Sequence, residues 1–146
     1  PTHLSARSNA PTLSPPAMLQ SGILNPQLLA LLARVRHTNT LVVADSMFPS
    51  WPGIETVDLS LVYGIPTVPQ VVAAILANWN AGNIWMATEF LAHNDTETQA
   101  EFRKAVGPSP LNFEAHLDLK RRVPGALGLI RTGERRIYTN LVLESA

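Results

Sequence analysis

The stretch that decides the fold runs from His37 to Asp45 and reads His-Thr-Asn-Thr-Leu-Val-Val-Ala-Asp. Residues 41–44 form a short continuous apolar run, which is typical of a strand buried on both faces of a parallel sheet. Asp45 then lies at the carboxyl end of this strand, where open α/β sheets bind ligands. A carboxylate at this position either caps the segment that follows or lines a pocket. The stretch therefore predicts an α/β sheet with a candidate site at its edge.

A helix is predicted immediately before this strand. Asn25 followed by Pro26 suits the N-cap and first position of a helix. The apolar residues that then fall on one helical stripe are Leu28, Leu29, Leu31, Leu32 and Val35. The helix is expected to end close to His37, and an interaction of this histidine with the helix dipole is one interpretation of its position. After the strand, residues 46–53 hold two prolines around Trp51 and are expected to form a loop, a candidate wall of a pocket.

Helices and short apolar strands alternate along the rest of the chain. Thr67 and Gln70 have the spacing of a capping box, ahead of a helix that reaches about Asn78. Further helices are expected at 95–105 and 116–122. The other expected strands are a short strand or turn within 55–62, and strands at 84–87, 127–130 and 141–143. This order predicts a single layered α/β domain over residues 21–146, preceded by a Pro-, Ser- and Thr-rich arm over residues 1–20.

The composition narrows the possible function classes. The eleven basic residues balance the eleven acidic ones, so no broad field attracts nucleic acid or an anionic membrane. The chain has no cysteine, which excludes disulfides, thiol catalysis and thiolate metal sites. No apolar run approaches the roughly 20 residues of a membrane helix, and no secretory signal is recognisable, so a cytoplasmic location is expected. With 46% hydrophobic and only 15% charged residues, the domain is expected to form an oligomer.

Metal and nucleotide sites are not predicted. The four histidines, at positions 3, 37, 93 and 116, show no local ligand spacing. The chain contains no Gly-rich phosphate loop, and Gly125-Ala126-Leu127-Gly128 lacks the context of a dinucleotide fingerprint. It also lacks the G-x-S-x-G motif of a nucleophile elbow.

Two further pairs of polar residues are candidates for a site. His116 and Lys120 are four residues apart, which places an imidazole and an ammonium on one face of a helix, although a solvated helix face explains them equally well. Tyr138 and Asn140 flank Thr139 at the start of a predicted strand, so both side chains would point the same way. A phenol and a carboxamide suit the binding of sugar hydroxyls, while structural hydrogen bonds account for either residue alone.

The spacing of these segments as a whole resembles the D-ribose pyranase and L-fucose mutarotase family. The matching stretches are Gly22-Ile23-Leu24-Asn25, the residues from His37 to Asp45, Val57-Asp58 before Gly64-Ile65-Pro66, His116 with Lys120, and Arg131-Thr132-Gly133-Glu134 through Tyr138-Thr139-Asn140-Leu141. The resemblance runs from about residue 22 to the C-terminus. It implies a cytoplasmic, cofactor-free sugar isomerase that assembles as a ring-like homo-oligomer, a decamer, with active sites at subunit interfaces.

The resemblance also implies roles for single residues. His37 matches the catalytic proton donor of the family. The residues that match its sugar-binding positions are Asp45, His116, Tyr138 and Asn140, with Lys120 as an additional contact. His116 resembles the ribose branch, whereas the segment 132–135 is closer to the fucose branch, so the choice between these sugars stays open. The arm and the Trp51 loop depart from the family pattern.

The predicted function is therefore a pyranase or mutarotase that opens and closes the ring of an aldose by general acid/base catalysis. His37 is expected to be the acid/base, and Asp45 either orients it or binds a hydroxyl. The alternative is a non-catalytic monosaccharide-binding or sugar-transport accessory protein, which would use the same side chains. A purely structural ring protein is a third possibility and would bind no sugar.

Overall fold

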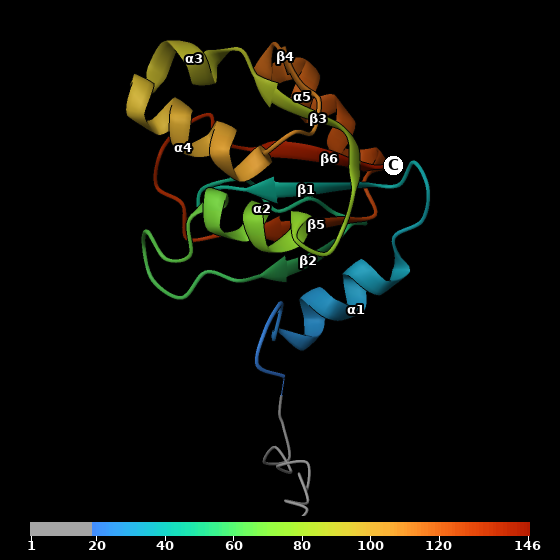
Figure 1. Ribbon diagram of the computed structural model, residues 1–146. Helices are drawn as coiled ribbons and strands as arrows, with labels where there is room; N and C mark the ends of the chain where they lie inside the picture. Colours follow the sequence, from blue (N-terminus) through green and yellow to red (C-terminus); the bar gives the residue numbers. More distant parts are fainter. Residues whose placement is uncertain (1–18) are drawn as a thin grey trace, which may run out of the picture.

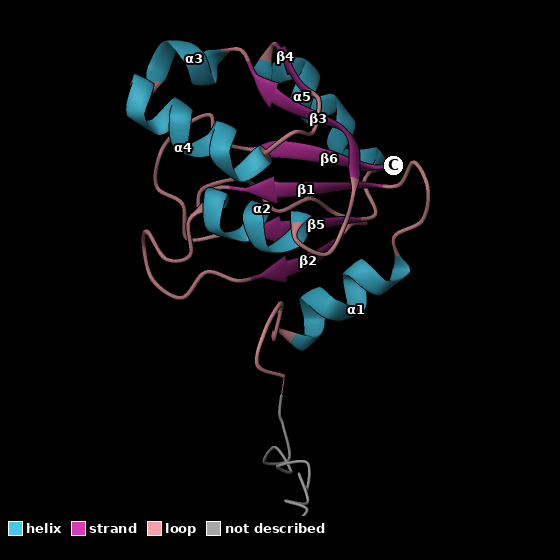
Figure 2. Ribbon diagram, in the orientation of Figure 1, coloured by secondary structure: helices cyan, strands magenta, loops and turns pink. Residues whose placement is uncertain are grey.

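A six-stranded sheet forms the centre of the molecule, in a computed structural model that describes residues 19–146 (Figures 1 and 2). The strand order is β2-β5-β1-β6-β3-β4. The strands are β1 (Thr40–Ala44), β2 (Glu55–Asp58), β3 (Ala81–Ala87), β4 (Leu111–Glu114), β5 (Gly128–Arg131) and β6 (Leu141–Ser145). The predicted α/β domain is confirmed, while nearly all of the predicted arm, residues 1–18, lies outside the described part of the chain.

The sheet is mixed, which corrects the expectation of a parallel sheet. β1 pairs parallel with β5 but antiparallel with β6, and β3 pairs antiparallel with β6 on its other side. The segment 132–140 between β5 and β6 is shorter than the dozen or so residues that a parallel crossover needs, so β6 returns antiparallel. Val43 lies opposite Leu141, and the beginning of β6 therefore lies beside the end of β1.

Helices cover both faces of the sheet (Figure 1). The helices are α1 (Pro26–Arg34), α2 (Val68–Leu76), α3 (Glu89–His93), α4 (Thr96–Val106) and α5 (His116–Arg122), with a 3₁₀ turn at Val123–Gly125. Side chains of α1, α2, α3 and α4 form the larger apolar core with one face of the sheet. On the other face, Leu119 of α5 packs with Val42 and Val142 in a second, smaller core. Both faces of β1 are thus buried, as its apolar run predicted.

The helix starts follow the predicted caps. The backbone N–H of Leu28 donates to Asn25 Oδ1 at 2.9 Å, and Thr67 and Gln70 form a capping box at α2. The predicted stripe on α1 is only partly correct, because Leu28, Leu31 and Val35 are buried whereas Leu29 is exposed and Leu32 is half-buried. The buried positions repeat every three to four residues, and Leu29 lies to the side of that line.

Two elements were not predicted. α3 has five residues and no side-chain N-cap, and β4 has the sequence Leu-Asn-Phe-Glu directly after a proline. Neither element is long enough to show the repeating pattern of apolar residues from which helices and strands are predicted. No helix within residues 19–146 is long and apolar enough to cross a membrane.

Candidate functional site

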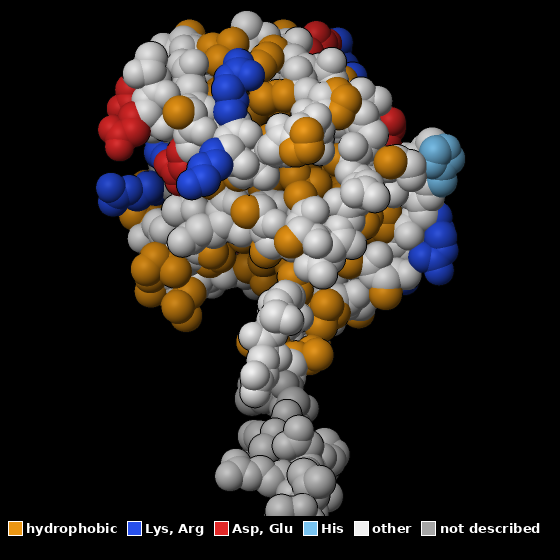
Figure 3. All heavy atoms as spheres, viewed as in Figure 1, with side chains coloured by type: hydrophobic (Ala, Val, Ile, Leu, Met, Phe, Trp, Pro, Cys, Tyr) orange, Lys and Arg blue, Asp and Glu red, His pale blue; other side chains and the backbone are white. Residues whose placement is uncertain are grey.

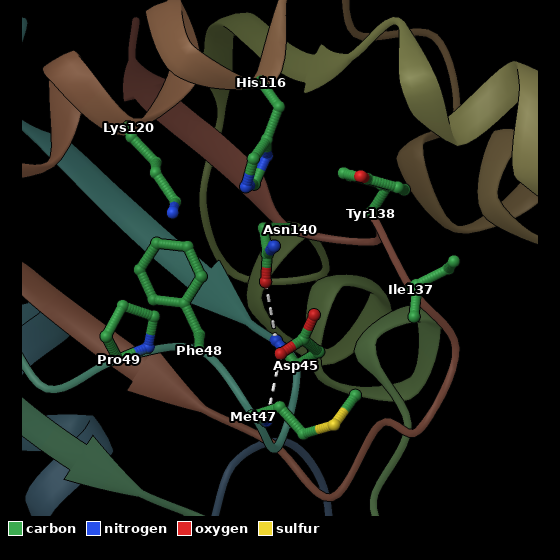
Figure 4. A pocket seen from close by; sticks show the side chains of 9 residues that line it. All are labelled: Asp45, Met47, Phe48, Pro49, His116, Lys120, Ile137, Tyr138 and Asn140. Atoms are coloured by element: carbon green, nitrogen blue, oxygen red, sulfur yellow. Dashed lines mark hydrogen bonds between the residues drawn. The ribbon is translucent and has the colours of Figure 1, made fainter.

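A cavity of about 270 Å³ opens where β1 ends and β6 begins (Figure 4). Its polar lining consists of Asp45, His116, Lys120, Tyr138 and Asn140, and its apolar lining of Met47, Phe48, Pro49 and Ile137. Five of the six predicted site residues therefore come together, from three separate segments of the chain. The volume lies just below the roughly 300–1,000 Å³ of typical ligand pockets, which favours a small molecule. Within residues 19–146, no group of three His, Asp or Glu side chains is arranged to hold a metal ion.

The antiparallel pairing of β1 and β6 brings Asp45 next to Asn140. The backbone N–H of Asp45 donates to Asn140 Oδ1 at 2.8 Å, and both residues are buried (Figure 4). Because a backbone N–H can only donate, this bond identifies the carboxamide atom that faces it as the oxygen. The amide nitrogen of Asn140 is therefore the atom left to donate hydrogen bonds to a ligand.

The Asp45 carboxylate combines the two roles between which the sequence left a choice. Its Oδ1 accepts the backbone N–H of Met47 at 3.0 Å, so it caps the turn that follows β1, and it also lines the cavity. Burial raises the pKa of Asp45 above its ordinary value, although hydrogen bonds from the Met47 and Phe48 backbone oppose the shift. A buried carboxylate with a raised pKa is a suitable partner for a sugar hydroxyl.

His116 and Lys120 project from the first two turns of α5 into the same cavity (Figure 4). The Glu89 carboxylate accepts the backbone N–H of His116 at 2.9 Å and so fixes the start of this helix. His116 Nδ1 is buried and has no hydrogen-bond partner in the described part of the chain. Burial lowers the pKa of His116, and the nearby Lys120 ammonium lowers it further. The imidazole is therefore neutral at neutral pH, and its ring lines the cavity.

Tyr138 reaches the cavity by a different route from the predicted one. β6 begins only at Leu141, and Tyr138 has a φ of 56°, in the left-handed region. Alternation along a strand is therefore the wrong explanation for its common direction with Asn140, although both residues do line the cavity. The Tyr138 ring lies near two imidazoles, with centroids 5.2 Å from His116 and 5.0 Å from His93.

The loop after β1 forms the apolar wall of the cavity, as predicted. Met47, Phe48 and Pro49 line it, whereas Trp51 stacks beside Phe48 with ring centroids 6.1 Å apart. Arg131, at the end of β5, donates from its guanidinium to the Phe48 carbonyl at 2.9 Å and holds the loop against the sheet. Sequence reasoning missed Arg131, although a charged residue at the end of an apolar strand marks the same sheet edge as Asp45.

His37 precedes β1 and lies at the opposite end of the β1 and β6 strands from this cavity. The N–H of the adjacent Thr38 donates to the carbonyl of Ser145, at the end of β6, at 3.2 Å. Asn140, directly before β6, lies five residues before Ser145, which corresponds to about 16 Å of extended chain. The His37 side chain is exposed and belongs neither to α1, which ends at Arg34, nor to the cavity of its own chain.

The fold and the site define a small α/β domain with a polar, acid- and base-lined cavity for a small molecule. A model of the RbsD / FucU transport protein family matches residues 18–146, and the chain belongs to this family. D-ribose pyranase of Chromobacterium violaceum is 37% identical over 128 residues, which cover 88% of this chain and 97% of that protein. D-ribose pyranase of Cutibacterium acnes is 36% identical over 126 residues, 86% of this chain and 95% of that protein.

Two solved structures share the fold. Bacillus subtilis RbsD complexed with D-ribose has a TM-score of 0.81 at 29% identity, and the match covers 88% of this chain and 98% of that one. The fucose mutarotase of Streptococcus pneumoniae in complex with L-fucose has a TM-score of 0.71 at 19% identity, covering 84% and 92% of the two chains. At that identity the second match concerns the fold alone. The family predicted from the sequence motifs is confirmed.

Proposed function

We propose that the protein is an isomerase that interconverts the pyranose and furanose forms of D-ribose. The observation that carries this proposal is the cavity in which five polar side chains converge, in a chain 37% identical to a D-ribose pyranase. A carboxylate, a neutral imidazole, an ammonium, a phenol and a carboxamide together supply hydrogen-bond donors and acceptors for a small polyhydroxylated ligand.

Exchange between ring forms needs only proton transfers. One proton leaves the anomeric hydroxyl, another is delivered to the ring oxygen, and the ring opens to the aldehyde. Closure through a different hydroxyl then converts a pyranose into a furanose. Because no C–H bond breaks, acid and base side chains suffice, and each typically contributes about 10²–10⁴-fold.

The roles of the cavity residues follow from their hydrogen-bonding capacity. Asp45 accepts from a sugar hydroxyl, and Asn140 donates through its amide nitrogen, since its oxygen is already bound. His116 contributes its neutral imidazole, and Lys120 and Tyr138 complete the sugar contacts. Holding the open-chain aldehyde in one orientation should add to the acid/base contribution.

His37 is the acid/base, and it acts in the cavity of a neighbouring subunit. Within its own chain it lies at the far edge of the sheet, about 16 Å or more from the cavity. In such an assembly, the surface of one copy that carries His37 contacts the surface of the next copy that carries the cavity. These two surfaces are different. Such a head-to-tail contact closes into a ring when its rotation allows. The separation of His37 from the cavity of its own chain supports a ring-like homo-oligomer, a decamer by family resemblance, with sites at subunit interfaces.

Exposed apolar side chains around the cavity support an interface there. Met47 and Ile137 line the cavity and remain 59% and 45% exposed, and Leu117, next to His116, is 68% exposed. The loop between β2 and α2 adds Leu61, Val62, Tyr63 and Ile65. Figure 3 shows hydrophobic atoms gathered over this loop, at the lower left of the view. Exposed apolar surface next to a site is typical of a protein contact.

His116 and the segment 132–135, which resemble the ribose and the fucose branch respectively, lie at different places relative to the cavity. His116, which resembles the ribose branch, lines the cavity. Glu134 is only 1% exposed, and its carboxylate accepts from Arg136 and from the backbone N–H of Val68, so the segment 132–135 supports the fold outside the cavity. The residue that faces the sugar therefore favours D-ribose over L-fucose. We also infer that residues 21–146 are the catalytic domain and that the protein acts in the cytoplasm.

The family description, which speaks of transport, favours a second candidate, a non-catalytic sugar-binding accessory protein. Calorimetric titration and NMR magnetisation exchange with D-ribose, L-fucose and other aldoses separate the two. Binding of D-ribose with accelerated exchange supports the isomerase, and faster exchange of L-fucose alone would assign the fucose branch. Binding without acceleration of any aldose would establish the accessory protein instead.

A further inference from the structure

Tyr138 is held at the cavity in a backbone conformation that residues other than glycine rarely adopt, with a φ of 56°. Such a conformation persists where the surrounding structure holds it, and it is frequent at binding sites. We infer that Asn94, which does not line the cavity, is the positioning residue that presents Tyr138 to the sugar. This inference rests on the proposed function, because it concerns the same cavity.

The Asn94 side chain bonds directly to the turn that carries Tyr138. Its Nδ2 donates to the Ile137 carbonyl at 3.0 Å and to the Phe90 carbonyl at 3.1 Å. The Ile137 carbonyl belongs to the peptide group that leads into Tyr138. The bond therefore ties this peptide group to the end of α3 and restrains the rotation that sets the φ of Tyr138.

Asn94 is itself held by the corner between α3 and α4. Gln99 Nε2 donates to the carbonyls of Asn94 and Leu91 at 3.0 and 3.1 Å, and Asp95 caps α4. On the other side of the turn, the buried Thr139 hydroxyl donates to the Arg136 carbonyl at 2.9 Å. The turn is thus closed within itself by Thr139 and tied to the helix corner by Asn94.

The same corner also contacts the Tyr138 ring. His93, adjacent to Asn94, places its ring 5.0 Å from that of Tyr138, and His116 meets the phenol edge-on at 5.2 Å. Aromatic pairs at such distances restrict ring orientation. Residues 93 and 94 therefore act on both the ring and the backbone of Tyr138.

Asn94→Ala tests this role, with Asn78→Ala as the matched control. Asn78 Nδ2 donates to the Ala74 carbonyl at 3.1 Å, the same four-residue bond that Asn94 makes to Phe90, but far from the cavity. Asn94→Ala should weaken D-ribose binding by about three- to tenfold, as expected for the loss of one or two hydrogen bonds. Asn78→Ala should change it by less than about twofold while lowering thermal stability to a similar degree.

A double-mutant cycle separates positioning from general loosening. In a Tyr138→Ala background, Asn94→Ala should weaken binding by less than about twofold, because the residue through which it acts is gone. Equal losses in both backgrounds, or no loss with Tyr138 present, would overturn the inference.

An NMR measurement without sugar keeps this test independent of the proposed function. The chain has two tyrosines, Tyr63 and Tyr138, so selectively labelled tyrosine rings give two assignable signals. Asn94→Ala should move the Tyr138 signal and leave the Tyr63 signal in place. An unmoved Tyr138 signal would refute the positioning role, whereas failure of the wild-type protein to bind or convert any aldose would refute the proposed function alone.

Discussion

His37→Ala removes the imidazole assigned as the acid/base. Exchange of D-ribose ring forms should fall by about 10²–10⁴-fold. Since His37 is exposed, the fold should be unaffected, which circular dichroism and thermal unfolding would check. Arg36→Gln is the matched control, because it changes the neighbouring exposed side chain without removing an imidazole. An active His37→Ala variant would exclude His37 from the mechanism.

The pH dependence of binding depends on His116. Burial and then Lys120 lower its pKa below the ordinary 6.5, against the opposing effects of Glu89 and Asp45. The neutral imidazole should bind the sugar, so D-ribose affinity should fall only at pH values below 6.5, as the ring takes up a proton. Lys120→Gln removes a cation that disfavours the imidazolium, so the pKa should rise and the acid limb should move to higher pH.

Calorimetric titrations across pH would measure the position of the acid limb of D-ribose binding. An NMR titration of the His116 ring would measure its pKa. Arg121→Gln is the control, because it removes a like charge from the same helix, one that pairs with Asp118 at 2.8 Å and does not line the cavity. An acid limb that stays in place in Lys120→Gln, or moves to lower pH, would contradict the assignment.

The positions of some site residues could be predicted from the sequence, and those of others could not. His116 and Lys120 could be paired from sequence because helical spacing determines which side chains share a face. The direction of Tyr138 depends on a left-handed turn to which Asn94 bonds from a distant segment, and no local pattern encodes this contact. His37 and Asp45 lie on opposite sides of β1 already in the sequence, whereas a contact of His37 with another subunit has no local pattern.

Contact between the loop 59–66 and the segment 132–134 can be tested at Gly133. A Cβ on Gly133 would lie 2.3 Å from the Ile65 carbonyl oxygen and 2.6 Å from that of Val62. Gly133→Ala should therefore destabilise the protein by about 1–3 kcal/mol and displace the exposed apolar loop. Gly125→Ala, with nothing within 4 Å of its Cβ, should change stability by less than about 0.5 kcal/mol. Equal unfolding free energies of the two variants in denaturant would contradict this close contact.

Helices and strands that have a side-chain cap or a sustained apolar pattern could be predicted from the sequence, whereas the shortest elements could not. α1 and α2 begin at their predicted caps, and β1, β3 and β6 include the predicted apolar runs, while β5 is displaced by one residue from the predicted 127–130. β4 has too few apolar residues to show a period, and α3 is shorter than two turns. The antiparallel direction of β6 depends on its pairing with β1 and β3 after a short connection, and this pairing is a property of the whole sheet.

Subunit mixing tests whether the site combines residues of two chains. His37→Ala has an intact cavity and His116→Ala an intact His37, so each pure protein should be nearly inactive. If His37 acts in the neighbouring subunit, a mixed assembly formed by dissociation and reassociation should restore about a quarter of the sites. Mixed assemblies with no more activity than the separate variants would place His37 outside the neighbour's cavity.

The proposed isomerase activity is measured directly by NMR magnetisation exchange between the pyranose and furanose forms of D-ribose. The spectra would be recorded without protein and with catalytic amounts of the folded, wild-type chain, and repeated with L-fucose. Exchange of D-ribose should be faster with protein present, and the effect on L-fucose should be smaller. Unchanged exchange of D-ribose, in the presence of folded protein that binds the sugar, would contradict the proposed activity.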